Sequence, residues 1–276
     1  MVIDKCGESL ITSGMPIGIF DSGVGGLTVV RAMEEHLPNE NLVYFGDTAR
    51  YPYGTRSPEI VTEFALQNAG LLTSFGIKLL IVACNTASSV AIPILQKNID
   101  VPLIGVILPG AVDAADSTKN GKIGVIATQG TVKSNAYKTA IHNRNSDVSV
   151  FSKACPLFVA LATEGFSGDI VQRIAHYYLD ELIQEGIDTL VLGCTHYPLL
   201  KKDIQEVVGD GVNLIDSADA TVKVVKEYLH SNNLINSSCN KLPDKFIVSD
   251  SPENFMEIGS NFLKHRINNV NLIRIR

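Results

Sequence analysis

The chain has 276 residues, of which 45% are hydrophobic and 19% are charged, and its formal net charge is −6. This composition provides enough apolar surface for one large globular unit or two domains of ordinary size. The net negative charge argues against binding to nucleic acid or to an anionic membrane surface. We therefore expect the partner to be a small molecule.

The N-terminal segment 1–15 lacks a long apolar stretch, and no later run reaches the roughly 18 apolar residues of a membrane span. We expect a cytoplasmic protein in which residues 1–15 form a short N-terminal extension. The cysteines include no CxxC pair, which argues against a disulfide framework and a structural zinc site. They are Cys6, Cys84, Cys155, Cys194 and Cys239. Of these, Cys6, Cys155 and Cys239 are interpreted as structural or surface residues.

Short apolar runs alternate with longer helical patterns along most of the chain. Strands are expected at 17–20, 42–45, 79–83, 103–107, 123–127, 189–193, 213–216 and 245–249. Continuous apolar strands separated by helices are typical of parallel sheets that are covered on both faces. The predicted fold class is α/β.

Two segments of the chain are similar to each other. "LLTSFGIKLLIVACNT" (71–86) aligns without gaps to "ELIQEGIDTLVLGCTH" (181–196), and each copy contains a helix end, a Gly-Ile turn, a buried strand and then a cysteine. The flanking phrases "IGIFDSG" and "IGVIATQG", and "VPLIG" and "VNLID", repeat in the same order. We predict two similar, pseudo-symmetric α/β domains, each with a mainly parallel sheet.

The repeat places Cys84 and Cys194 at equivalent strand ends. Either cysteine alone is readily explained as an ordinary buried residue. The matched pair favours a functional site, because ligands of open α/β sheets bind at the carboxyl ends of the strands. If the two domains close on one substrate, the thiols reach it from opposite sides. That arrangement suits inversion of a stereocentre, since one group removes a proton from one face while another delivers a proton to the other.

The polar residues beside these strand ends also suit a cleft. "NTASSV" after Cys84 is typical of a helix start, whose free N–H groups would help to ionise the thiol and to hold an anion. Asp21 and Ser22 follow the first strand, and the glycines of "DSGVGG" would bring backbone N–H groups close to a ligand. This stretch lacks the third glycine of a dinucleotide-binding fingerprint, because position 28 is threonine.

Two further features have both a structural and a functional interpretation. The loop "FGDTARYPYGTRS" offers backbone N–H groups near Gly54, with Arg56 nearby, to a carboxylate, although turn chemistry alone also explains its composition. His196 is either a satisfied histidine at a strand end or a group that stabilises the Cys194 thiolate or shuttles protons. Metal binding by Cys194 and His196 is disfavoured because no further Cys/His cluster supplies the remaining ligands.

Six phrases together resemble a known family: "IGIFDSGVGGLTV", "YFGDTARYPYG", "ACNTAS", "GVILPGA", "IGVIATQGTVKS" and "LGCTHYPLL". In this order, from about Pro16 to Asp219, they are similar to the bacterial glutamate racemases of the aspartate/glutamate racemase superfamily. The resemblance implies an isomerase that interconverts L- and D-glutamate without cofactor or metal. It further implies a homodimer that supplies D-glutamate for peptidoglycan biosynthesis, and hence for cell wall biogenesis and cell shape.

The resemblance also implies roles for individual residues. Cys84 would act on the α-proton of D-glutamate and Cys194 on that of L-glutamate, with Asp21 and His196 assisting the respective thiols. The implied substrate-binding residues are Asp21, Ser22, Tyr53, Gly54, Asn85, Thr86, Thr195 and His196. Among them, Asn85, Thr86 and Thr195 would hold the α-carboxylate and ammonium, and the backbone of Tyr53 and Gly54 would hold the side-chain carboxylate.

The family architecture implies a first domain of residues 1–106 and 217–276 and a second of residues 107–216, with the active site in the cleft between them. Three alternatives remain open from the sequence. The first is a racemase for aspartate or another amino acid. The second is a thiol hydrolase or amidase in which one cysteine is incidental. The third is a two-lobed amino-acid-binding protein, against which the missing signal sequence counts.

Overall fold

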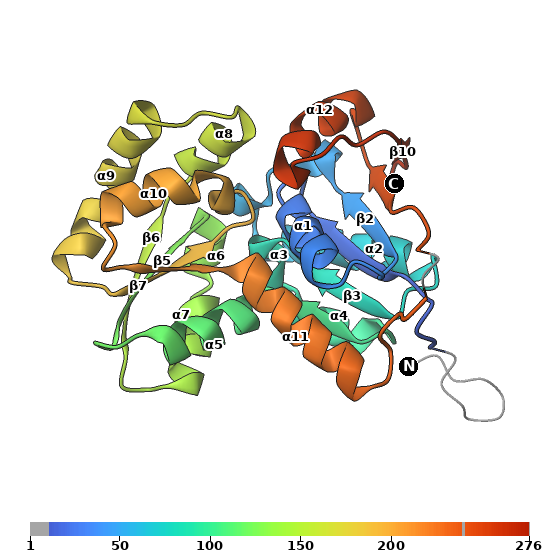
Figure 1. The fold of residues 1–276 in the computed structure, drawn as a ribbon, viewed down its shortest axis with the longest axis horizontal. Helices are drawn as coiled ribbons and strands as arrows, with labels where there is room; N and C mark the ends of the chain where they lie inside the picture. Colours follow the sequence, from blue (N-terminus) through green and yellow to red (C-terminus); the bar gives the residue numbers. More distant parts are fainter. Residues whose placement is uncertain (1–10, 239–240, 276) are drawn as a thin grey trace.

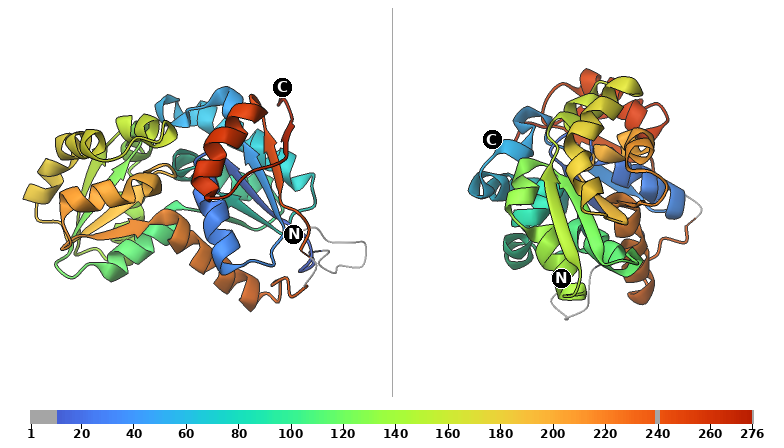
Figure 2. Two further views of the ribbon diagram at one scale, coloured as in Figure 1. Left: turned by 45° about the horizontal axis from the view of Figure 1, so that its top comes forward. Right: turned by 90° about the vertical axis from the view of Figure 1, so that its left-hand side faces the viewer.

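The computed structural model describes residues 11–238 and 241–275, and it contains two parallel sheets flanked by helices (Figure 1). The six-stranded sheet has the order β10-β9-β2-β1-β3-β4 and the four-stranded sheet the order β6-β5-β7-β8. We call each sheet with its helices a lobe, the six-stranded one the first. The two lobes lie side by side in Figure 1 and in the left view of Figure 2. The two parallel sheets flanked by helices confirm the predicted fold class.

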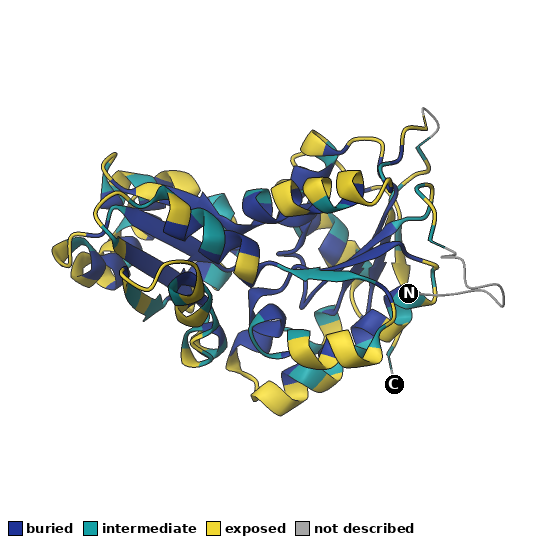
Figure 3. Cartoon of the chain, turned by 90° about the horizontal axis from the view of Figure 1, so that it is seen from below, coloured by how far each residue is buried: buried dark blue, intermediate teal, exposed yellow. Residues whose placement is uncertain are grey.

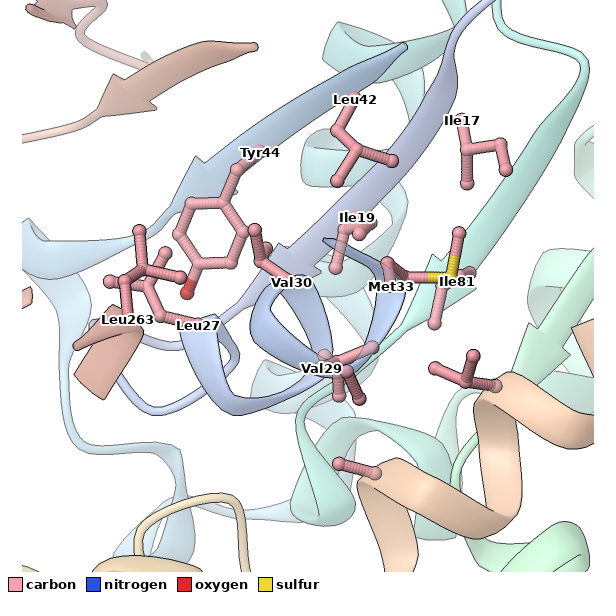
Figure 4. Close-up of a cluster of buried hydrophobic side chains, with 14 of the residues drawn as sticks. Ile17, Ile19, Leu27, Val29, Val30, Met33, Leu42, Tyr44, Ile81 and Leu263 are labelled. Atoms are coloured by element: carbon pink, nitrogen blue, oxygen red, sulfur yellow. The ribbon is translucent and has the colours of Figure 1, made fainter. Parts of the chain in front are cut away.

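The strands of the first lobe are β1 (Ile17–Asp21), β2 (Leu42–Gly46), β3 (Leu79–Val82), β4 (Leu103–Gly105), β9 (Lys245–Val248) and β10 (Val270–Leu272). Its helices are α1 (Leu27–His36), α2 (Pro58–Thr73), α3 (Asn85–Val90), α4 (Ile92–Asn98), α11 (Ser217–Ser231) and α12 (Pro252–Leu263). Both faces of this sheet are covered. Figure 4 shows one of them, where Val30 and Met33 of α1 pack on Ile19 of β1.

The strands of the second lobe are β5 (Lys122–Ala127), β6 (Ser149–Ala154), β7 (Thr189–Gly193) and β8 (Asn213–Asp216). Its helices are α5 (Ile107–Ser117), α6 (Gln129–Lys133), α7 (Ala136–Arg144), α8 (Leu157–Thr163), α9 (Asp169–Gln184) and α10 (Lys201–Val208). Most strand residues are buried while the helices expose their outer faces, as the burial colours show (Figure 3). This is the pattern expected of continuous apolar strands.

The internal repeat is visible in the pairing of the strands. The order β2-β1-β3-β4 in the first lobe has the same connectivity as β6-β5-β7-β8 in the second. Gly18 pairs with Leu80, and its counterpart Gly124 pairs with Leu190, the counterpart of Leu80. A Cβ on Gly18 would lie 2.7 Å from Ile77 Cδ1, and one on Gly124 would lie 2.7 Å from Ile187 Cδ1. The same close packing therefore recurs in both lobes.

Two strands were not predicted. β6 has mixed polarity, "SVFSKA", because it is the edge strand of its sheet and is only partly buried. β10 is a three-residue edge strand with no apolar run. The strand expected at 103–107 ends at Gly105, because Val106 is the N-cap of α5 and the helix begins at Ile107.

The chain passes from the first lobe to the second between β4 and α5, and it returns between β8 and α11. These crossings support the division at residues 107 and 217, which remains a prediction. In the described parts of the chain, no helix combines the length and apolar character needed to span a membrane. Cys6, Cys239 and most of the expected extension 1–15 lie outside the described residues.

Candidate active site

The two repeated cysteines meet at one cavity. Cys84 directly follows Ala83 at the end of β3, Cys194 follows β7, and each is only 5% exposed. Both thiol-bearing residues line a cavity of about 370 Å³. The cavity therefore lies at the carboxyl ends of β3 and β7, and because the strands of each sheet are parallel, the carboxyl ends of β1 and β5 lie at the same edges. The juxtaposition predicted from the repeat is therefore present.

Most of the predicted site residues reach this cavity. Its lining includes Ser22, Tyr53, Gly54, Cys84, Asn85, Thr86, Cys194, Thr195 and His196. Asp21 does not line it: the residue is fully buried, and its carboxylate accepts hydrogen bonds from Gly23 N (2.9 Å) and Thr195 Oγ1 (3.3 Å). Arg56 is exposed and does not line the cavity.

The glycine turn after β1 contacts protein groups rather than the cavity. A Cβ on Gly26 would lie 2.6 Å from Asp21 Cβ, and one on Gly25 would lie 2.5 Å from His196 Nδ1. Neither glycine lines the cavity. The expectation that this turn presents its N–H groups to a ligand is therefore wrong for Gly25 and Gly26. Instead, the small residues let the first lobe approach Thr195 and His196 of the second.

Both thiols are protonated at neutral pH in this structure. Burial raises the pKa of Cys84 to about 12, and the negative charge of Asp21 adds to this effect. A hydrogen bond from the backbone of Ala87 opposes it but is the smaller effect. Burial likewise raises the pKa of Cys194. The helix start after Cys84 thus favours the thiolate, as predicted, but burial outweighs it.

His196 lies beside Cys194 as a neutral imidazole. Its Nδ1 is 3.9 Å from Cys194 Sγ and 3.5 Å from Thr195 Oγ1. Burial lowers the pKa of His196 to about 4, so the ring is uncharged at neutral pH. Its Nε2 has no hydrogen-bond partner among the described residues, and the ring packs between Tyr51 and Phe262. The described residues contain no group of three or more Cys, His, Asp or Glu side chains placed to hold a metal.

The Tyr53 loop closes the first-lobe side of the cavity. The Tyr53 hydroxyl donates to the Asp47 carboxylate and accepts from Asn68 Nδ2 at 3.0 Å. The phenol is therefore engaged inside the first lobe. This supports the expectation that the loop meets a ligand through the backbone of Tyr53 and Gly54.

Sequence reasoning missed a cluster of three threonine hydroxyls across the lobes. Thr86 Oγ1 lies 2.9 Å from Thr128 Oγ1, and Thr131 Oγ1 lies 3.0 Å from Thr128 Oγ1. Thr128 also caps α6 and lines the cavity. The repeat contained the signal for it, because Thr128 aligns with Ser22 when Gly18 is aligned with Gly124. Side chains of α8, including Val159 and Thr163, were also missed, since no motif marks them.

The chain is similar to proteins of known family. The sequence pattern of the family described as Asp/Glu/Hydantoin racemase matches residues 17–225. The glutamate racemase of Geobacter metallireducens is 49% identical over 255 residues, which cover 92% of this chain and 94% of that protein. The glutamate racemase of Chlorobaculum tepidum is 45% identical over 265 residues, covering 95% and 97% of the two chains.

Solved structures of glutamate racemases are also similar to this chain. Glutamate racemase from Francisella tularensis in complex with D-glutamate has a TM-score of 0.88 and 40% identity, covering 95% of this chain and 98% of that one. Glutamate racemase isoform RacE1 from Bacillus anthracis has a TM-score of 0.91 and 38% identity, with the same coverage. The chain therefore belongs to the Asp/Glu/Hydantoin racemase family and, within it, to the glutamate racemases.

Proposed function

We propose that this protein interconverts L- and D-glutamate by moving protons between Cα and two thiols, without a cofactor. The observation that carries the proposal is the pair of buried thiols, Cys84 and Cys194, at equivalent strand ends on one cavity. The substrate assignment is supported by relatives named glutamate racemase at 44–51% identity and by the neighbouring structure in complex with D-glutamate.

In the proposed reaction, the Cys194 thiolate removes the α-proton of L-glutamate, and the Cys84 thiol donates its proton to the opposite face of the resulting carbanion. The products are D-glutamate, a Cys194 thiol and a Cys84 thiolate. The reverse reaction begins with the Cys84 thiolate and ends with the Cys84 thiol, so both atoms and charge balance. A single monoprotic base does not reach both faces of Cα in this way.

Thiolate formation needs help, because both thiols are neutral in this structure. A substrate ammonium group in the cavity would favour a nearby thiolate, since an opposite charge within about 4–6 Å stabilises the charged form. His196 Nδ1 lies 3.9 Å from Cys194 Sγ, so the neutral ring, in the tautomer with a proton on Nδ1, is placed to donate a hydrogen bond to the thiolate. The resemblance assigns Asp21 to Cys84, but the Asp21 charge raises the pKa of that thiol, and the carboxylate accepts a hydrogen bond from Thr195 Oγ1. We therefore propose that Asp21 supports the Cys194 side of the cavity.

The cavity provides different groups for the two ends of glutamate. Asn85, Thr86 and Thr195 line it near the thiols and are proposed to hold the α-carboxylate and ammonium. The backbone at Tyr53 and Gly54 is proposed to hold the side-chain carboxylate. The distance between these two sets of groups would then distinguish glutamate from the shorter aspartate.

The resemblance and the family membership further support a cytoplasmic homodimer that supplies D-glutamate for peptidoglycan biosynthesis. Light scattering of the purified protein tests the homodimer. Depletion of the protein in its host tests the cell-wall role, since added D-glutamate should then restore growth and cell shape.

Turnover of different amino acids tests the substrate. Purified protein is incubated separately with L-glutamate and L-aspartate without added cofactor, and the D-isomers are measured by chiral chromatography. We expect D-glutamate and no comparable D-aspartate. Preferential turnover of L-aspartate would assign a different substrate, a trapped acyl adduct would support a thiol hydrolase, and tight binding of glutamate without turnover would support a binding protein.

A further inference from the structure

Asn85 lines the cavity, and its amide nitrogen, Nδ2, is buried without a hydrogen-bond partner among the described residues. Asn85 is the first residue of α3, next to Cys84, and it is only 2% exposed. A buried donor left unpaired costs about 1–3 kcal/mol, so its presence beside a cavity indicates that a ligand atom accepts from it.

The other end of the same amide is fixed from the opposite lobe. Tyr137 of α7 donates a hydrogen bond from its hydroxyl to Asn85 Oδ1 at 2.7 Å. Because the Tyr137 hydroxyl donates to Asn85 Oδ1, the amide oxygen is directed to Tyr137 and the NH₂ group is left for another acceptor.

Tyr137 is well placed to hold this geometry. It is 2% exposed, and a Cβ on Gly193 would lie 2.9 Å from Tyr137 Cε2, so the ring rests against the residue that precedes Cys194. Burial raises the pKa of Tyr137, which keeps the hydroxyl protonated as a donor. Tyr137 therefore contacts the residue before one thiol and the residue after the other, although it does not itself line the cavity.

We propose that Tyr137 is a positioning residue for the racemisation: through its hydrogen bond to Asn85 Oδ1 it holds the Asn85 NH₂ group toward the α-carboxylate of the substrate. The inference rests on the proposed function and adds a residue that neither the motifs nor the cavity lining includes. Without the Tyr137 hydroxyl, the amide is free to turn its oxygen into the cavity. That oxygen would repel the substrate carboxylate.

The test is a double-mutant cycle on glutamate racemisation, with kcat and KM measured in both directions. Tyr137→Phe removes only the hydroxyl and keeps the ring against Gly193. We expect kcat/KM to fall about tenfold, mainly through a higher KM. Because L- and D-glutamate are equally stable, kcat/KM must fall equally in both directions, which checks the data. In the Asn85→Ala background, Tyr137→Phe should have almost no further effect, since the group it acts through is absent.

Tyr178→Phe is the matched control. It also removes the hydroxyl of a buried tyrosine in the second lobe, one that accepts from Leu157 N at 3.3 Å and does not line the cavity. Its KM for glutamate should stay at the wild-type value. A second variant, Asn85→Asp, keeps an acceptor for Tyr137 but replaces the cavity-facing NH₂ group with an oxygen, and it should raise KM strongly.

The outcomes separate this inference from the proposed function. Wild-type protein that does not racemise glutamate overturns the proposed function itself. Wild-type activity with an unchanged KM in Tyr137→Phe overturns the inference alone, as does an equal loss with and without Asn85. If Tyr137→Phe fails to fold, Asn85→Asp decides: a wild-type KM in that variant would show that the amide NH₂ group is not used.

Discussion

Gly25 lies so close to His196 that no side chain fits between them: a Cβ on Gly25 would stand 2.5 Å from His196 Nδ1 and 2.3 Å from Thr195 Oγ1. Gly25 belongs to the turn after β1, whereas Thr195 and His196 follow β7 in the other lobe. The absence of a side chain at Gly25 therefore sets how closely the two lobes approach beside Cys194.

Gly25→Ala should reduce activity far more than stability. The added methyl group forces His196 and Thr195 away from their positions beside Cys194, so we expect at least a tenfold loss in kcat/KM for glutamate. Gly70→Ala is the control, because a Cβ there meets nothing within 4 Å. It lies in the interior of α2, where alanine should stabilise the protein by up to about 1 kcal/mol. Equal activity of the two variants would show that the approach of Gly25 to His196 is unimportant.

Replacing either active-site thiol should abolish racemisation. Cys84→Ala and Cys194→Ala each remove one of the two proton carriers, so each should reduce the racemisation rate by about 10³-fold or more. Cys155→Ala is the control, because this buried thiol does not line the cavity and should be dispensable. Normal racemisation by either of the first two variants would rule out the two-thiol reaction.

His196 should make the protein less stable in acid. Its pKa falls from 6.5 to about 4 on burial, so below pH 6.5 the unfolded chain binds a proton that the folded protein does not. The stability present above pH 6.5 is therefore lost as the pH falls toward 4. Between pH 7 and about pH 4.5 the loss from this group is about 2–3 kcal/mol. Urea unfolding should show this loss for the wild type relative to His196→Gln, which does not titrate; parallel pH profiles would contradict it.

A buried ion pair far from the cavity should affect stability and not the reaction. Lys78 Nζ lies 2.6 Å from Glu40 Oε2, both side chains are almost fully buried, and Lys78 also donates to the Leu234 carbonyl at 2.7 Å. Lys78→Met leaves the buried Glu40 carboxylate without its cation, with only the hydrogen bond from Asn236 N (2.8 Å) remaining, so we expect about 3–5 kcal/mol of destabilisation. The double variant Lys78→Met/Glu40→Met should recover part of it. A change in KM for glutamate in either variant would contradict this separation.

The sequence was sufficient to predict the central part of the fold because both sheets are parallel and buried. The sequence of such a strand is a continuous apolar run, which can be recognised without the structure. The internal repeat then indicated that Cys84 and Cys194 lie at equivalent strand ends. The edge strand β6 was not predicted, because a strand that is only partly buried can have a sequence of mixed polarity. The same argument applies to the site: residues that follow a buried strand could be found, whereas Thr163 on α8 could not.

Other features depend on contacts between segments that are far apart in the chain. The hydrogen bond from Tyr137 to Asn85 joins residues 52 positions apart, and no periodicity or motif connects them. The approach of Gly25 to His196 likewise exists only once the lobes are packed together. The ionisation of Cys84 also depended on burial, which a helix-start motif does not reveal.

Deuterium incorporation during the first turnovers tests the two-thiol account most directly. Purified wild-type protein is incubated with L-glutamate in deuterated water, and both enantiomers are isolated before much product has formed. Because one thiol removes the proton and a different, deuterated thiol delivers to the other face, the account predicts that D-glutamate carries deuterium at Cα while the remaining L-glutamate does not. Early deuterium in both enantiomers, or D-glutamate that retains the original proton, would contradict it.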